Sequence, residues 1–139
     1  MPIRVYLDTE LVMAFLFDRS EFAAELEALV NIMSDETLER YCSVFCIDRI
    51  YHIASRREGG DDAFRAVVTR FMRFVEPLDV DVEDIMSAVN SGMRDFEKAV
   101  MLCSAGRKGA GIVLSLTEKG YGNPPMPIMT PLKFLNTDH

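Results

Sequence analysis

The chain has 139 residues, of which 49% are hydrophobic and 27% charged, a composition typical of one globular domain. Its net charge of −7 excludes a protein that grips nucleic acid with a wholly basic surface, but it does not exclude a local basic patch. The three cysteines form no CxxC pair, and no apolar run reaches the ~20 residues of a membrane helix. We therefore expect a single cytoplasmic domain over residues 1–139, with reduced thiols and no membrane segment.

The first part of the chain shows a strand pattern followed by two helix patterns. Residues 3–7 (IRVYL) predict a short buried strand, after which Thr9 is expected to cap a helix. Ser20 is expected to open a second helix over 21–33. Asp8 lies between two apolar runs, where a carboxylate is costly unless it is paired or binds a metal. It is therefore a helix cap, a buried partner of another group, or a site residue.

The middle of the chain carries a second acid of this kind. Residues 40–46 mix strand and helix signals, and from Val44 onward the pattern follows one helix face. Asp48 falls on that face among apolar residues. The remaining predicted elements are helices over 63–72, 82–89 and 95–106, strands over 74–80, 112–115 and 127–129, and a helical turn that starts at Pro131. Pro77 indicates that the 74–80 strand lies at an edge or ends there.

Short apolar strands that alternate with helices predict an α/β fold, a three-layer sandwich with a central, mostly parallel sheet of about four or five strands. In such sheets the binding crevice lies at the carboxyl ends of the strands. Asp8 follows one predicted strand and Ser115 ends another. The two residues share an edge of the sheet if their strands are neighbours.

The order of four motifs resembles the PIN-domain family, which includes metal-dependent ribonucleases and many toxins of bacterial toxin–antitoxin pairs. The motifs are VYLDTELVMAFL, SVFCIDRIYHIA, RDFEKAVMLCSAGRKGAGIVLSLTEKGY and MPIMTPLKFL. The resemblance covers nearly the whole chain. It implies a PIN-like fold and a site in which carboxylates from separate elements converge on Mg²⁺ or Mn²⁺, because hard cations prefer oxygen ligands.

The resemblance assigns candidate metal ligands and catalytic acids residue by residue. Asp8 matches the first acid of the family, and Asp48 stands where the family usually has Glu. The third acid position is occupied by Lys98, so Asp95 or Glu97 is the candidate substitute. We expect Asp8, Asp48 and Asp95 to be metal ligands, and these three together with Glu97 to be catalytic.

Several neighbouring residues are expected to support this site. They are Thr9, Glu10, Lys98, Ser115, Thr117 and Glu118. The family's Thr-x-Asn/Asp is Ser115-Leu116-Thr117 here, so Glu118 is the nearest acid to the fourth position. Lys98 is expected to stand in for the metal as a tethered cation, in an ion pair with Asp8 or Asp48. Arg49 and Arg56 are candidate nucleic-acid contacts beside the Asp48 helix.

Two functional readings follow from the resemblance. The first is a PIN-like metal-dependent endoribonuclease, a candidate toxin of a toxin–antitoxin pair, with RNA as substrate and an antitoxin as partner. The alternative is a catalytically degenerate PIN-like module that binds RNA or a protein partner. Lys98 and Thr117 favour the second reading, whereas Asp8 and Asp48 favour the first. The resemblance also implies a homodimer.

Overall fold

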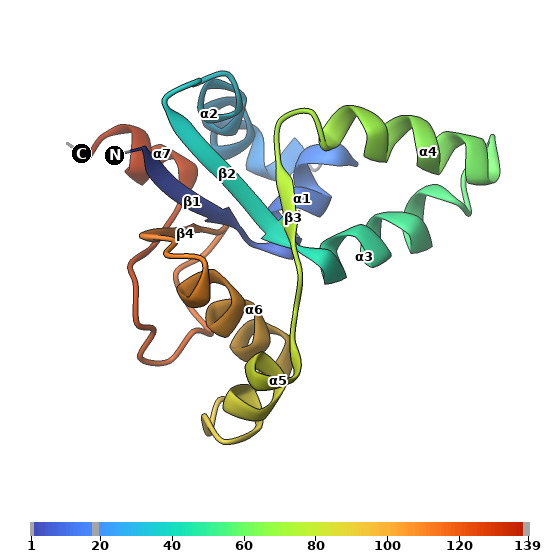
Figure 1. Cartoon of the computed structure of the whole chain (residues 1–139). Coiled ribbons are helices and arrows are strands. Elements are labelled where there is room, and N and C mark those ends of the chain that lie inside the picture. The colour runs from blue at the N-terminus through green and yellow to red at the C-terminus, as the bar shows by residue number, and fades with distance from the viewer. Residues whose placement is uncertain (1, 18–19, 138–139) are drawn as a thin grey trace.

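The computed structural model describes residues 2–17 and 20–137, with the side chain of Ser20 left aside, and is built on a five-stranded parallel sheet (Figure 1). The strands are β1 (Ile3–Leu7), β2 (Leu38–Ser43), β3 (Glu76–Leu78), β4 (Ile112–Leu114) and β5 (Ile128–Met129). Their order across the sheet is β3-β2-β1-β4-β5, and every neighbouring pair is parallel. The predicted fold class is therefore confirmed.

Helices cover both faces of this sheet, which makes the three layers visible in Figure 1. The helices are α1 (Thr9–Leu16), α2 (Ala23–Met33), α3 (Val44–Ala54), α4 (Gly60–Phe71), α5 (Val82–Val89), α6 (Phe96–Arg107) and α7 (Pro131–Leu135), with a 3₁₀ turn, η1, at Ser20–Phe22. The first four and α7 share one core cluster, while α6 packs on the opposite face with α5 beside it. Within residues 2–17 and 20–137, none of the helices is sufficiently long and apolar to span a bilayer.

Strand β1 shows why the sheet needs a helical layer on each face. Val5 and Leu7 belong to the core under α1 and α2, whereas Tyr6 between them faces the core under α6. All three side chains are almost completely buried. Because successive side chains of a strand point to opposite faces, three consecutive apolar residues must be covered on both sides of the sheet.

The structure corrects several boundaries at positions where side chains compete for backbone groups. Asp8, not Thr9, caps α1, because its carboxylate accepts the free N–H groups of the first turn. The second helical segment starts as the 3₁₀ turn η1, and α2 begins only at Ala23. Strand β3 is shorter than predicted and forms one edge of the sheet, as Pro77 indicated.

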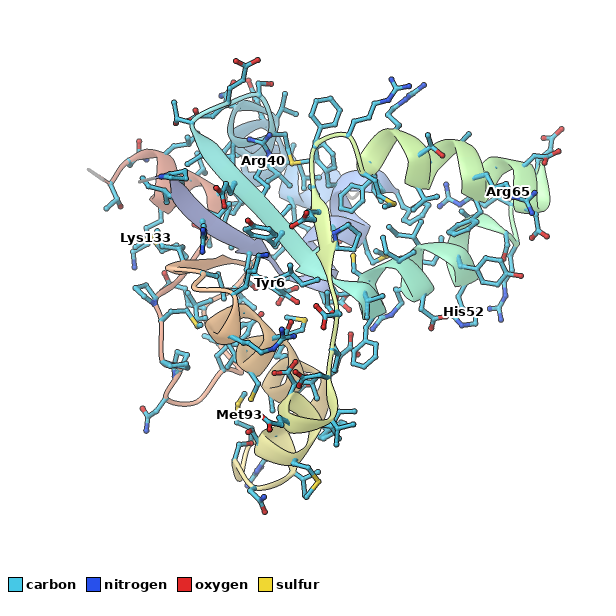
Figure 2. The ribbon with its side chains drawn as sticks, viewed as in Figure 1. Tyr6, Arg40, His52, Arg65, Met93 and Lys133 are labelled. Atoms are coloured by element: carbon cyan, nitrogen blue, oxygen red, sulfur yellow. The ribbon has the colours of Figure 1, made fainter. Side chains whose placement is uncertain are left out.

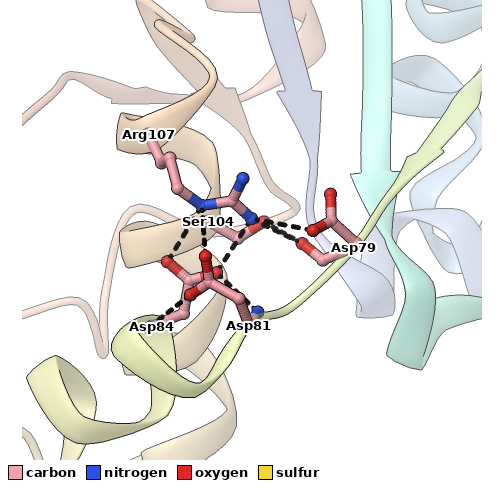
Figure 3. Close-up of polar contacts among 5 residues, drawn as sticks. All are labelled: Asp79, Asp81, Asp84, Ser104 and Arg107. Carbon is pink, nitrogen blue, oxygen red and sulfur yellow. Dashed lines mark hydrogen bonds and ion pairs between the residues drawn. The ribbon is translucent and has the colours of Figure 1, made fainter.

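Helix α5 is held on α6 by a cluster of charged residues, drawn in Figure 3. Arg107 contacts three carboxylates, at 3.0 Å from Asp84 and 3.5 Å from both Asp79 and Asp81. Asp81 and Asp84 also form a capping box at the start of α5. Burial alone would raise the pKa of Asp84, but hydrogen bonds from Arg107 hold it below its ordinary value. The cluster fixes where α5 and the turn after it lie.

Candidate functional site at the carboxyl edge of the sheet

The central pair of strands brings the two sequence-predicted edge residues together. β1 and β4 are neighbours, and the backbone N–H of Asp8 donates to the carbonyl of Leu114 over 2.9 Å. Ser115, the next residue after β4, donates its hydroxyl to Asp8 Oδ2 over 3.2 Å. The conditional prediction that Asp8 and Ser115 share one edge is therefore confirmed.

The carboxylate of Asp8 is buried, and both of its oxygens accept hydrogen bonds from the protein. Oδ1 accepts the N–H groups of Glu10 at 2.7 Å and Leu11 at 3.3 Å. Oδ2 accepts the hydroxyls of Ser115 and Tyr121. Four donors around one carboxylate satisfy the requirement that a buried charge be fully hydrogen-bonded. Asp8 is therefore at once a helix cap and a buried partner.

Tyr121 is one of the two side chains that donate a hydroxyl hydrogen bond to Asp8 Oδ2. Its ring is buried, and burial together with the negative charge of Asp8 raises the pKa of its phenol, so the hydroxyl remains a donor. The ammonium of Lys98 lies over the ring, with Nζ 4.7 Å from the ring centre. Such a cation–ring contact is favourable because the face of the ring is negative. Tyr121 therefore contacts both the Asp8 carboxylate and the Lys98 ammonium.

Arg49 supplies the cation that pairs with acids at this edge. Its guanidinium lies 3.0 Å from Glu10 Oε1 and 3.5 Å from Glu97 Oε2, so it joins α1 to the start of α6. Burial acts to lower the pKa of Arg49, but the hydrogen bond and charge of Glu10 and the charge of Glu97 raise it above its usual value. The positive charge at this edge is thus permanent.

These residues enclose a small hollow of about 80 Å³, which we call the carboxylate hollow. It is lined by Asp8, Thr9, Glu10, Arg49, Asp95, Glu97, Lys98 and Met101. Four carboxylates therefore meet two cations in one place.

The chemistry of this donor set does not fit a resident Mg²⁺ or Mn²⁺ ion. The oxygens of Asp8 are taken by four protein donors, and Glu10 and Glu97 face the guanidinium of Arg49. Asp95 accepts the N–H of Lys98 as the cap of α6. In the described part of the chain, no group of three or more His, Cys, Asp or Glu side chains is arranged to hold a metal ion. Hard cations need several free oxygen ligands around one point.

A family model described as PIN domain matches residues 4–116, which is most of the chain. The chain belongs to the PIN domain family. No curated protein matches this PIN domain.

Solved structures similar to this PIN domain share its fold at low sequence identity. A toxin–antitoxin complex from Klebsiella pneumoniae matches with a TM-score of 0.68 and 12% identity, covering 91% of this chain and 97% of the other. DNA-bound VapBC from Salmonella typhimurium matches with a TM-score of 0.64 and 15% identity, covering 91% of this chain and 96% of the other. The sarcin–ricin loop cleaving toxin VapC20 of Mycobacterium tuberculosis matches with a TM-score of 0.60 and 17% identity, covering 78% of this chain and 86% of the other.

Some residues that the resemblance assigned to the site lie outside the carboxylate hollow of this PIN domain. Asp48 is not buried on an apolar helix face, since its side chain is 72% exposed and lies 3.4 Å from His52. It lines an adjacent hollow of about 260 Å³ with Phe45, Arg49, His52, Phe96 and Glu97. Glu118 forms a 2.8 Å ion pair with Lys133 of α7. Thr117 holds the turn after β4, and Arg56 is exposed after α3.

The expected ion pair of Lys98 with Asp8 or Asp48 is wrong, because Lys98 stacks on Tyr121 instead. Arg49, which the sequence suggested as a nucleic-acid contact, forms the ion pairs at this edge. Sequence reasoning also missed Tyr121 as a site residue. The available signal was a large aromatic residue between two glycines, in a loop that is otherwise polar.

Proposed function

We propose that this PIN domain acts by binding a protein partner, and that it does not hydrolyse RNA through a divalent metal. The observation that carries the proposal is the saturation of Asp8 by four protein donors, with Arg49 paired to the acids beside it. A metal would have to displace these contacts. Each of them is a hydrogen bond or ion pair to a charged group, the class that costs most to break.

The proposed partner is a protein of the antitoxin type. An apolar groove of about 340 Å³ lies between α1, α2 and α4, lined by Phe15, Leu16, Val30, Met33, Val67 and Phe71, with Arg70 at its side. Val30 at this groove is 50% exposed. A concave apolar surface of this kind fits the apolar face of an amphipathic segment. Several similar folds were solved as toxin–antitoxin complexes, which supports this choice of partner.

Partner binding is tested with a valine pair of matched exposure. Val30→Glu places a charge in the groove, whereas Val44→Glu places the same charge on a valine that is 43% exposed at the start of α3. The partner is first captured from the native host with the parent protein and is then made separately. Calorimetry measures its affinity for the parent and for each variant. We expect Val30→Glu to weaken binding at least about tenfold and Val44→Glu to leave it unchanged. Equal affinities for both variants and the parent would contradict a partner in the groove.

The second candidate function is a metal-dependent endoribonuclease, favoured by the four carboxylates that line one hollow. Single-stranded RNA is incubated with the pure protein and Mn²⁺, beside Asp8→Asn. Under our proposal neither protein cleaves. Cleavage by the parent that is lost in Asp8→Asn would overturn the binding-only function and establish a nuclease.

The role of Lys98 is tested by restoring an acid. Lys98→Asp removes a cation from the carboxylate hollow and adds a fifth carboxylate. Because Lys98→Asp leaves the four donors to Asp8 and the ion pairs of Arg49 in place, we expect calorimetry to detect no Mn²⁺ binding by this variant or by the parent. Lys108→Asp, at the opposite end of α6, is the matched control. Mn²⁺ binding by Lys98→Asp but not by Lys108→Asp would show that Lys98, and not the hydrogen bonding of Asp8, is what opposes a metal.

The predicted homodimer has one supporting surface. Val82, Ile85, Met86 and Val89 form an apolar stripe along α5, with Val82 73% exposed. Residues at this spacing lie on one helix face. A second copy of the chain that covered this stripe would make a dimer. Light scattering measures the molar mass of the parent and of Met86→Glu in solution. We expect a dimeric parent and a monomeric variant, and a monomeric parent would refute the dimer.

A further inference from the structure

A second hollow adjoins the carboxylate hollow, and nothing so far assigns a ligand to it. It has a volume of about 570 Å³ and lies between the turn after α5 and the loop before β5. Met93, labelled in Figure 2, marks the turn. Lys98 and Asp95 line both hollows. We call this space the glycine-loop hollow, after Gly120 and Gly122 on its other wall.

Two unpaired cations border the glycine-loop hollow. Neither Arg94 nor Lys98 forms an ion pair with any residue in the part of the chain that the structure describes. The one carboxylate on the wall, Asp95, accepts the backbone N–H of Lys98.

The glycine loop lies close to the ammonium of Lys98. Gly120 has a φ of +88°, and a Cβ at this position would lie 2.9 Å from Lys98 Nζ. The positive φ favours glycine at this position, and the ammonium at the mobile end of the Lys98 side chain lies beside the backbone. Gly122 also has a positive φ, of +63°, and a Cβ there would meet nothing within 4 Å, so the backbone borders open space.

The backbone of this loop offers free donors. Across residues 2–17 and 20–137, no hydrogen-bond acceptor is found for the N–H groups of Gly120, Gly122 or Asn123. Backbone N–H groups in glycine-rich turns bind anions when they border a concavity. Here they border the same hollow as two unpaired cations.

We propose that the glycine-loop hollow binds a phosphate group, with Arg94 and Lys98 as its cationic contacts and the N–H groups of Gly120, Gly122 and Asn123 as backbone donors. Phosphate is the anion that best matches a guanidinium, an ammonium and several N–H groups together. The hollow is several times larger than one phosphate, which leaves room for the nucleoside attached to it. The proposal is independent of the protein partner and of metal-dependent hydrolysis.

The test uses three probes on the isotope-labelled full chain: inorganic phosphate, a 5′-phosphorylated trinucleotide of RNA, and the same trinucleotide with a 5′-hydroxyl. Amide chemical shifts are followed at constant ionic strength. We expect saturable shifts at Gly120, Gly122 and Asn123. Lys98→Gln and Arg94→Gln should each weaken binding about tenfold, the loss typical of one charge-assisted contact.

Lys108→Gln is the matched control, because Lys108 also lies over a tyrosine ring, with Nζ 5.7 Å from the centre of Tyr41, but outside the glycine-loop hollow. It should leave binding unchanged, and Lys98→Arg should restore most of it. Tighter binding of the 5′-phosphorylated trinucleotide supports a terminal phosphate, and equal binding of both trinucleotides supports an internal diester. No saturable shift with any probe, or an equal loss in Lys108→Gln, overturns the proposal. Circular dichroism of each variant verifies that it is folded.

Discussion

Tyr121→Phe removes one oxygen atom and with it the hydrogen bond from the phenol to Asp8. Asp8 Oδ2 then keeps only the hydroxyl of Ser115, at 3.2 Å. Water cannot replace the lost donor easily, because Asp8 is only 2% exposed and Tyr121 only 1%. A hydrogen bond to a charged group is worth about 1.5–3 kcal/mol, so we expect the free energy of unfolding to fall by about 2 kcal/mol.

This loss converts into a measurable change in melting temperature. An unfolding entropy of about 2.1 cal/mol/K per residue gives roughly 0.3 kcal/mol/K for a chain of this length, so the Tm of Tyr121→Phe should fall by about 7 °C. Differential scanning calorimetry at pH 7 measures it. Tyr51→Phe is the control, since Tyr51 is 40% exposed and packs on rings. Its Tm should change by less than about 2 °C.

Two further results decide whether the reasoning is right. In an Asp8→Asn background the same tyrosine change should cost at least about 1 kcal/mol less, because the charged acceptor is gone. The pKa of Tyr121 is raised above the unfolded value of 10.0 by burial and by Asp8, so its contribution is complete below pH 10 and is lost as the pH rises toward the folded pKa. The Tm difference should therefore stay constant up to about pH 9 and narrow as the pH rises above 10. An unchanged Tm at pH 7, or full additivity with Asp8→Asn, refutes the account.

Two other predictions concern the layers that support the site. Arg107→Ala leaves the buried carboxylate of Asp84 without its guanidinium, so the urea midpoint at pH 7 should fall. Because Arg107 holds the pKa of Asp84 below 3.8, this contribution is present above about pH 4 and is lost as the pH falls through the folded pKa; a deficit that persists unchanged at pH 2 would contradict it. Leu11→Ala empties a fully buried position of α1 and should cost about 3 kcal/mol by urea unfolding, whereas Leu135→Ala, at a residue 43% exposed, should cost under about 1 kcal/mol; similar costs would place the core elsewhere.

The sequence by itself determined the sheet and most of its helices. Short apolar runs that alternate with helix-period segments favour a parallel sheet covered on both faces, because Val5, Tyr6 and Leu7 are consecutive apolar residues that point to opposite faces. The signals over residues 40–46 were mixed, and only the structure assigns Leu38–Ser43 to strand β2. The sequence also predicted helix ends that depend only on residues close together in the chain. Asp95 caps α6 as expected, and Pro131 starts α7.

Only the tertiary structure decided which charges meet. Asp48 and Arg49 are adjacent in sequence, yet the direction of α3 turns Asp48 to solvent beside His52 and brings Arg49 to Glu10 and Glu97. A helical pattern with mixed residues does not fix that rotation, since packing against α1 and the sheet sets it. The donor from Tyr121 to Asp8 crosses 113 positions of sequence. Local propensity carries no information about such a contact, because it depends on strand order and loop path.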